Sequence, residues 1–264
     1  MRLRDVFTKS LYDRRHGIVW WSLAIGLLTL SVLSAWPSVR DEYQRLVANY
    51  PPALPAFFGI ERNGLDTAAG YLQAELFSLL VPLSLIAYMI AAGSAATAGE
   101  EEAGTLDLLL AQPVSRRRVL VEKYAAACAS LAVITVAFVV VLIAFTRVFD
   151  IHVAVLHLVA GCVSAYVLAT LFGGVALFAG CATGHRALAA GVAAAAAIAA
   201  YLLSSLATLV EGLRRFRPVS PFWWYSGHEP LRRGLEPLHV ALLCAVTIVF
   251  VVASAVVFER RDLA

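Results

Sequence analysis

The sequence predicts an all-α integral membrane protein with six transmembrane helices, and two observations carry this prediction. First, 61% of the 264 residues are hydrophobic and 15% are charged. Soluble domains have about 45–50% apolar residues and about 25% charged residues. Second, the apolar residues are gathered into runs. Each run is long enough to cross a bilayer core of about 30 Å, which needs about 20 helical residues. We therefore interpret residues 1–264 as a single transmembrane domain.

Six runs qualify as spans, and the charged residues lie between and beside them. The spans cover residues 17–36, 72–97, 122–146, 153–182, 187–210 and 239–258. The formal net charge of +3 suits anionic membrane lipids as partners and gives no support for nucleic-acid binding. The preference for Arg over Lys and the abundance of Ala hint at a bacterial source.

The distribution of Lys and Arg predicts the orientation of the chain in a bacterial plasma (inner) membrane. With both termini in the cytoplasm, the inner segments hold the larger share of these residues, as the positive-inside rule requires. The basic segment 211–238 then lies outside and weakens this prediction. The basic cluster at the N-terminus usually dominates, so we keep the termini inside.

The first 15 residues predict a helix that lies in the membrane interface. Leu3, Val6, Phe7 and Leu11 recur at helical spacing, with basic residues around them. An apolar stripe flanked by Arg and Lys is typical of helices that lie along a membrane surface. The alternative is a frayed basic tail that only sets the orientation.

The loop between the second and third spans holds more local signals than a connector requires. Glu100, Glu101 and Glu102 end the second helix, and Gly104 permits a sharp turn. Thr105 is suited to cap a new helix. The three glutamates are close enough in sequence to pair with the arginines of 116–118, although exposed ion pairs contribute only about 0–1 kcal/mol each.

The second half of this loop predicts a short helix with a defined end. Leu106, Leu109 and Leu110 form one apolar stripe, with Asp107 on another face. Pro113 stops the short helix. Ser115 is suited to cap the third long helix, which opens at Arg116. A helix of about two turns, fixed at both ends, is thus expected in the interface.

The stretch EEAGTLDLLLAQPVSRRRVLVEKY, residues 101–124, resembles the signature loop of ABC-2 type transporter permeases, the membrane subunits of bacterial ABC exporters. The shared features are Glu-Glu-x-Gly-Thr-Leu, a Leu-rich helix and a Pro-Val-Ser-Arg turn. Asp107 departs mildly, because the family often has Glu at that position. The loop also stands at the family's usual place, between spans two and three.

The resemblance implies that this loop is a cytoplasmic coupling helix, which docks into a separate ABC ATPase subunit. It further implies an ATP-driven exporter that pairs with a second permease copy, with ATP and Mg held by the ATPase. The implied coupling residues are Glu100, Glu101, Glu102, Gly104, Thr105, Leu106, Asp107, Leu109, Leu110, Pro113, Ser115 and Arg116. The alternative is a solvated charged loop that only orients the protein.

An aromatic cluster precedes the last span. Phe222, Trp223, Trp224 and Tyr225 are typical of an interfacial anchor, and four prolines nearby prevent one long helix. The resemblance implies a re-entrant segment here, dipping into the outer leaflet beneath the exit. An aromatic anchor with no transport role remains the alternative.

Few polar residues fall within the spans. Gln73 and Glu75 lie near the outer end of the second span and His157 near that of the fourth. They are candidates for a polar path, or they simply face water at the interface. The span centres lack the chain of acids and bases that a proton-driven transporter uses, which favours an external energy source. Small residues such as Gly93 and Gly173 are interpreted as helix-packing positions.

The sequence argues against an enzyme. It has no Gly-Lys pair and hence no Walker A loop, and no Gly-x-Ser-x-Gly or His-Glu-x-x-His motif. We expect no catalytic, cofactor or metal site in this chain. The apolar interior favours a lipid, an amphipathic drug or an apolar peptide as substrate. Two alternative functions stay open: an ATP-independent secondary transporter or channel, and a non-transporting immunity or sensor subunit.

Overall fold

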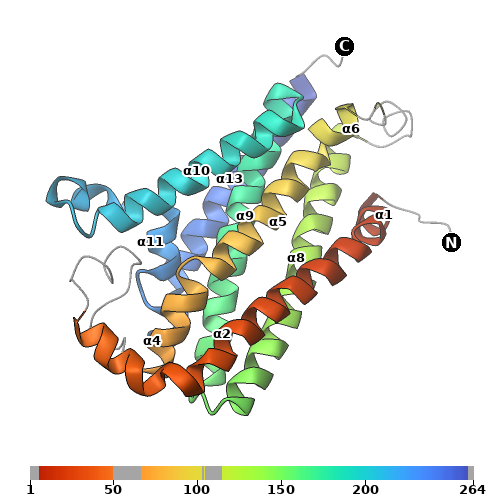
Figure 1. Cartoon of the computed structure of the whole chain (residues 1–264). Helices are drawn as coiled ribbons and strands as arrows, with labels where there is room; N and C mark the ends of the chain where they lie inside the picture. Colours follow the sequence, from red (N-terminus) through yellow and green to blue (C-terminus); the bar gives the residue numbers. More distant parts are fainter. Residues whose placement is uncertain (1–5, 50–66, 103, 105–114, 261–264) are drawn as a thin grey trace.

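The structure is a computed structural model that describes residues 6–49, 67–102, 104 and 115–260. Within these ranges it is a helical bundle, and six of its helices are long and apolar enough to cross a membrane. Figure 1 shows α1 (Val6–Asp13) and the C-terminal part of α13 (Pro237–Arg260) at the same end of the bundle, which we call the terminal end; the other is the opposite end. The fold class predicted from the sequence is confirmed.

The elements follow the predicted order of spans and connecting segments. They are α1 (Val6–Asp13), α2 (Arg15–Asn49), α4 (Ala68–Leu72), the π-helical turn η1 (Gln73–Phe77), α5 (Leu80–Ala96), α6 (Ala98–Glu102), α8 (Arg116–Val148), α9 (Val155–Thr183), α10 (Arg186–Leu206), the 3-10 helix η2 (Glu211–Val219), α11 (Pro221–Ser226), α12 (Pro230–Arg233) and α13 (Pro237–Arg260).

Helix α9 is the centre of the bundle. It packs against α5, α13, α10 and α8, and most of its residues are buried. The crossing with α5 is closest at paired glycines, where a Cβ added to Gly93 would lie 2.3 Å from the carbonyl oxygen of Gly173. Small residues let helix backbones approach in this way, which is the packing role expected for them.

Helix α10 is less buried than its neighbours. Its buried side chains are Ala189, Ala193, Ala197, Ser204 and Ser205. The three alanines recur every four residues and therefore lie on one face of the helix. Larger side chains point outward, and Ile198 is 58% exposed. The fully buried face of α10 is thus a narrow stripe of small residues.

The first span, Arg15–Ser38, agrees closely with the predicted 17–36, but its helix extends further. The apolar run was expected to end at residue 36, but α2 continues through Pro37 to Asn49. A proline inside a helix removes one hydrogen bond and kinks the helix without necessarily ending it. Figure 1 shows α2 changing direction in its C-terminal part.

The second span is interrupted, where the sequence predicts one helix over 72–97. α4 passes into the π-helical turn η1, and Leu79 breaks the helix with φ −142° before α5 begins. Pro82 follows this break directly. It lacks the N–H that would donate to the Ser78 carbonyl, and its ring crowds that carbonyl. The irregular backbone therefore has a local chemical cause.

Candidate functional site

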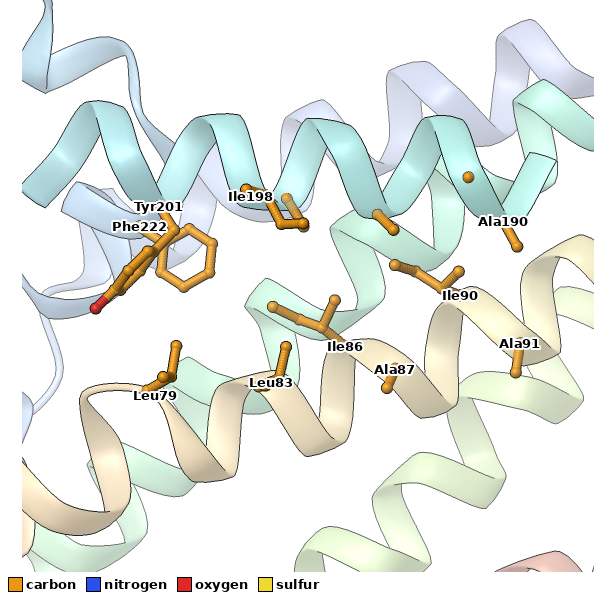
Figure 2. Close-up of a pocket in the computed structure, with 13 residues that line it drawn as sticks. Leu79, Leu83, Ile86, Ala87, Ile90, Ala91, Ala190, Ile198, Tyr201 and Phe222 are labelled. Atoms are coloured by element: carbon orange, nitrogen blue, oxygen red, sulfur yellow. The ribbon is translucent and has the colours of Figure 1, made fainter. Parts of the chain in front are cut away.

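An apolar groove of about 510 Å³ runs between α5 and α10. Figure 2 shows Leu83 and Ile86 pointing from α5 towards α10. The α5 wall consists of Leu79, Leu83, Ile86, Ala87, Ile90 and Ala91. The α10 wall consists of Ala190, Gly191, Ala194, Ala197, Ile198 and Tyr201, and Phe222 of α11 closes one end.

The groove exists because the two walls carry side chains of different size. α10 supplies mainly alanine and glycine, whose side chains are too short to fill the space beside α5. The α5 wall carries leucine and isoleucine, of which Leu83 is 52% exposed. A wall of this kind gives an amphipathic or apolar molecule a surface to lie against, and it offers few hydrogen-bonding groups to a polar solute.

Two aromatic rings form the end of the groove nearest the opposite end of the bundle. The rings of Tyr201 and Phe222 meet edge to face at a centroid distance of 5.4 Å. α11 is held in place by Ser220, whose hydroxyl donates to the Ala200 carbonyl at 2.7 Å and accepts from the Phe222 amide. The predicted aromatic cluster therefore includes one residue of the groove.

The rest of the aromatic cluster anchors α11 to the bundle. Tyr225 is buried, and its hydroxyl donates to the Phe77 carbonyl at 2.6 Å. Burial raises the pKa of the Tyr225 phenol well above its usual range, so it remains a neutral donor. Trp224 donates to the Pro218 carbonyl at 2.8 Å, and Trp223 packs against His239. The segment thus folds back into the bundle.

The three polar residues predicted to mark a path lie near the opposite end. Gln73 and Glu75 both belong to η1, and Glu75 is exposed. His157 lies in the first turn of α9 and is half-buried. None of the three lines the groove, so the structure does not bring them together with its apolar walls.

The acidic cluster lies at the terminal end, in the short helix α6. Glu100 forms an ion pair with Lys123 of α8, with Oε1 and Nζ 2.6 Å apart. Glu102 accepts a hydrogen bond from the backbone N–H of Arg186 at 2.8 Å. Because His185 provides no side-chain cap, Glu102 satisfies the first amide of α10 from another helix.

The connector after α6 begins and ends with the predicted local signals. Gly104 has φ +65°, a left-handed conformation that suits glycine. Ser115 caps α8 by accepting from the Arg118 amide, and Arg116 is the first residue of that helix. Six predicted coupling residues lie outside the described residues, namely Thr105, Leu106, Asp107, Leu109, Leu110 and Pro113.

Sequence reasoning missed two charged residues that organise this end. Glu122 of α8 accepts from the amides of Val6 and Phe7 at 3.1 and 3.2 Å, so it caps the N-terminus of α1. Lys123 is the other, with a side chain only 6% exposed. Adjacent charges at the start of an apolar span could have signalled both, since buried charges need partners.

The six candidate spans, packed around α9, define a polytopic helical membrane protein. A comparison with family models matches residues 5–263 to the ABC-2 family transporter proteins, and the chain belongs to that family. It is therefore a membrane permease component of an ABC transporter, and the family implies an ABC ATPase subunit as its partner. No curated protein matches the chain.

Proposed function

We propose that this chain is the permease subunit of an ATP-driven exporter and that the groove between α5 and α10 forms part of the translocation path. One observation supports this above the others. α10 forms one wall of the groove, and the backbone N–H of its first residue, Arg186, donates a hydrogen bond to Glu102. Glu102 lies at the start of the loop that is expected to meet the ATPase.

The hydrogen bond from Arg186 to Glu102 supplies a route for coupling. Glu102 lies two residues before Gly104, where the chain turns into the segment 105–114. A displacement of that segment by the ATPase pulls on Glu102 and so on the N-terminus of α10. Glu100 and Lys123 hold the same short helix to α8, so the displacement reaches two spans at once.

The groove is open on one side, which is the reason we propose a second permease copy across it. Leu83 on one wall and Ile198 on the other are more than half exposed. Apolar surface of this extent faces either lipid or protein. A homodimer or heterodimer closes the path from that side, with ATP and Mg bound by two ATPase subunits.

The proposed orientation places the terminal end in the cytoplasm of a bacterial cell. The ATPase then meets the loop after α6, and the aromatic segment around α11 lies towards the outer leaflet. The apolar groove lining favours a lipid, an amphipathic drug or an apolar peptide over sugars or ions.

The test is coupling between ATP hydrolysis and transport in reconstituted vesicles. We expect Gly104→Pro and Glu102→Arg to abolish ATP-dependent efflux while membrane insertion is unchanged. Glu259→Arg is the matched control, because Glu259 is an exposed acid at the same end, in the last turn of α13. Normal efflux in both loop variants removes the coupling assignment.

Two other results separate the alternative functions. Gradient-driven flux in vesicles that contain the purified chain alone supports a secondary transporter or channel. Stable binding of an ATPase without any flux of lipids, drugs or peptides supports an immunity or sensor subunit. Co-purification of the tagged chain with a Walker A protein, lost in the loop variants, supports the exporter.

A further inference from the structure

A second hollow, of about 380 Å³, lies at the terminal end between α1, α2 and α5, and it is polar. Three cationic residues line it: Arg14, Lys123 and Arg186. Two acids, Asp13 and Glu100, also line it. The five charges come from different parts of the chain. Asp13 ends α1 and Arg14 joins α1 to α2, whereas Glu100, Lys123 and Arg186 belong to α6, α8 and α10.

Two of the three cations, Arg14 and Lys123, are held in place by the bundle. Arg14 donates from Nη2 to the Ala92 carbonyl at 3.3 Å, which fixes the guanidinium across α5. A guanidinium has five N–H donors, so one such bond leaves others for a ligand. The Lys123 ammonium is ion-paired with Glu100, which also lines the cavity, and its side chain is only 6% exposed. The lining charges sum to one positive charge, which favours a monoanion.

The cavity lies at the ends of candidate membrane spans, where lipid head groups are expected. Two spans begin beside it, at Arg15 and Arg186, and Lys123 of a third lines it. The ends of transmembrane helices meet the polar interface of the bilayer, and basic pockets between such helices bind anionic head groups. Trp21 adds an aromatic wall, which suits the boundary between head groups and acyl chains.

The polar cavity and the apolar groove adjoin on the surface of α5. Ala91 lines both of them, and Ala87 and Ala91 are exposed between the two. Two methyl groups form a low ridge, so an acyl chain passes from one hollow to the other without displacing a large side chain.

We propose that these two hollows form one site for an anionic phospholipid, with its phosphodiester in the polar cavity and an acyl chain in the groove. This rests on the proposed function and deepens it, because it names an anionic amphiphile of the adjoining leaflet as the class of molecule that enters the path. The phosphate lies among Arg14, Lys123 and Arg186, where charge-assisted hydrogen bonds are strongest.

The experiment measures lipid binding to the purified chain in neutral detergent, without any ATPase. Native mass spectrometry compares dioleoyl phosphatidylglycerol with dioleoyl phosphatidylcholine. We expect the anionic lipid to bind about tenfold more tightly, and Arg14→Gln and Arg186→Gln each to weaken it by about tenfold, as the loss of one hydrogen bond to a charged group predicts. Arg186 is exposed, so its replacement does not threaten folding.

Arg15→Gln is the matched control. Arg15 neighbours Arg14 in sequence, but its guanidinium lies 3.9 Å from the centre of the Tyr12 ring and it does not line the cavity. Unchanged binding in this variant supports the site. Equal binding of the two lipids, or an equal loss in Arg15→Gln, overturns it. Displacement of the lipid by millimolar inorganic phosphate also overturns it, because the cavity then binds a free anion.

The outcome is independent of the coupling test. A failure to bind anionic lipid leaves ATP-dependent export by this chain untouched and removes only the substrate class. Conversely, normal lipid binding in Glu102→Arg, together with lost efflux, shows that the site is intact while the link to the ATPase is broken.

Discussion

Replacing Gly93 with alanine is expected to force α5 and α9 apart. The new Cβ would lie 2.3 Å from the Gly173 carbonyl oxygen, whereas an ordinary contact between carbon and oxygen is about 3.3 Å. Because the obstacle is backbone, no side chain can rotate to make room, and the helices must separate by about 1 Å. Overpacking of this kind costs about 1–3 kcal/mol, more than the gain of about 0.5–1 kcal/mol from replacing a helical glycine.

Two other glycines supply graded comparisons for the same substitution. A Cβ at Gly173 would meet the Met89 methyl at 2.6 Å and the Met89 Cβ at 3.0 Å. The methyl is the end of a flexible side chain, so Gly173→Ala should cost less than Gly93→Ala. A Cβ added at Gly191 would have no neighbouring atom within 4 Å, so Gly191→Ala should be neutral or slightly stabilising.

Thermal unfolding in detergent measures this series. For Gly93→Ala we expect a melting temperature lower by on the order of 5 °C, a smaller decrease for Gly173→Ala and none for Gly191→Ala. Equal decreases in all three variants would refute the reasoning. The cost would then not come from the backbone contact between α5 and α9.

Three further predictions concern polar contacts. Glu100→Gln should destabilise the fold by about 3 kcal/mol, which is more than Lys123→Met, because Lys123 is the more buried partner and is left charged. Thermal unfolding of both variants checks this order. Tyr225→Phe should cost about 1 kcal/mol by removing the bond to the Phe77 carbonyl, measured in the same way. Glu122→Gln should speed amide hydrogen exchange at the start of α1, because two N–H groups lose a carboxylate acceptor.

The first two of these predictions have controls. Combining Glu100→Gln with Lys123→Met should recover part of the lost stability, since no buried charge then remains unpaired. Tyr12→Phe should leave the melting temperature unchanged, because Tyr12 is 47% exposed. A double variant less stable than Glu100→Gln alone, or an effect of Tyr12→Phe equal to that of Tyr225→Phe, contradicts the corresponding assignment.

The spans could be predicted because each apolar run carries its own signal. Runs of hydrophobic residues, Gly104 and Ser115 act locally, and the structure confirms the turn at Gly104 and the cap at Ser115. The π-helical turn before Pro82 was not foreseen, because a proline in the first turn of a helix gives no sign of how the preceding backbone adapts. The extension of α2 through Pro37 was missed for a related reason: the end of an apolar run does not mark the end of a helix.

Contacts between distant segments could not be predicted from one sequence. Nothing near Glu102 in the sequence indicates that its carboxylate caps a helix that begins 84 residues later. The groove is equally hidden, because it depends on which face of the alanine-rich α10 meets α5. Composition indicates only that this helix can approach others closely.

The distribution of buried side chains supports the proposal that α10, rather than α9, is the helix displaced during transport. α9 buries large side chains such as Phe172 in the centre of the bundle, so displacing it would open cavities. Between Arg186 and Ala200, α10 buries only alanine side chains, which make few dispersion contacts and leave small cavities when they shift; at its other end Tyr201 packs on Phe222. Under the proposed coupling, a pull by Glu102 on the first residue of α10 is therefore expected to change the width of the groove before it disturbs the core.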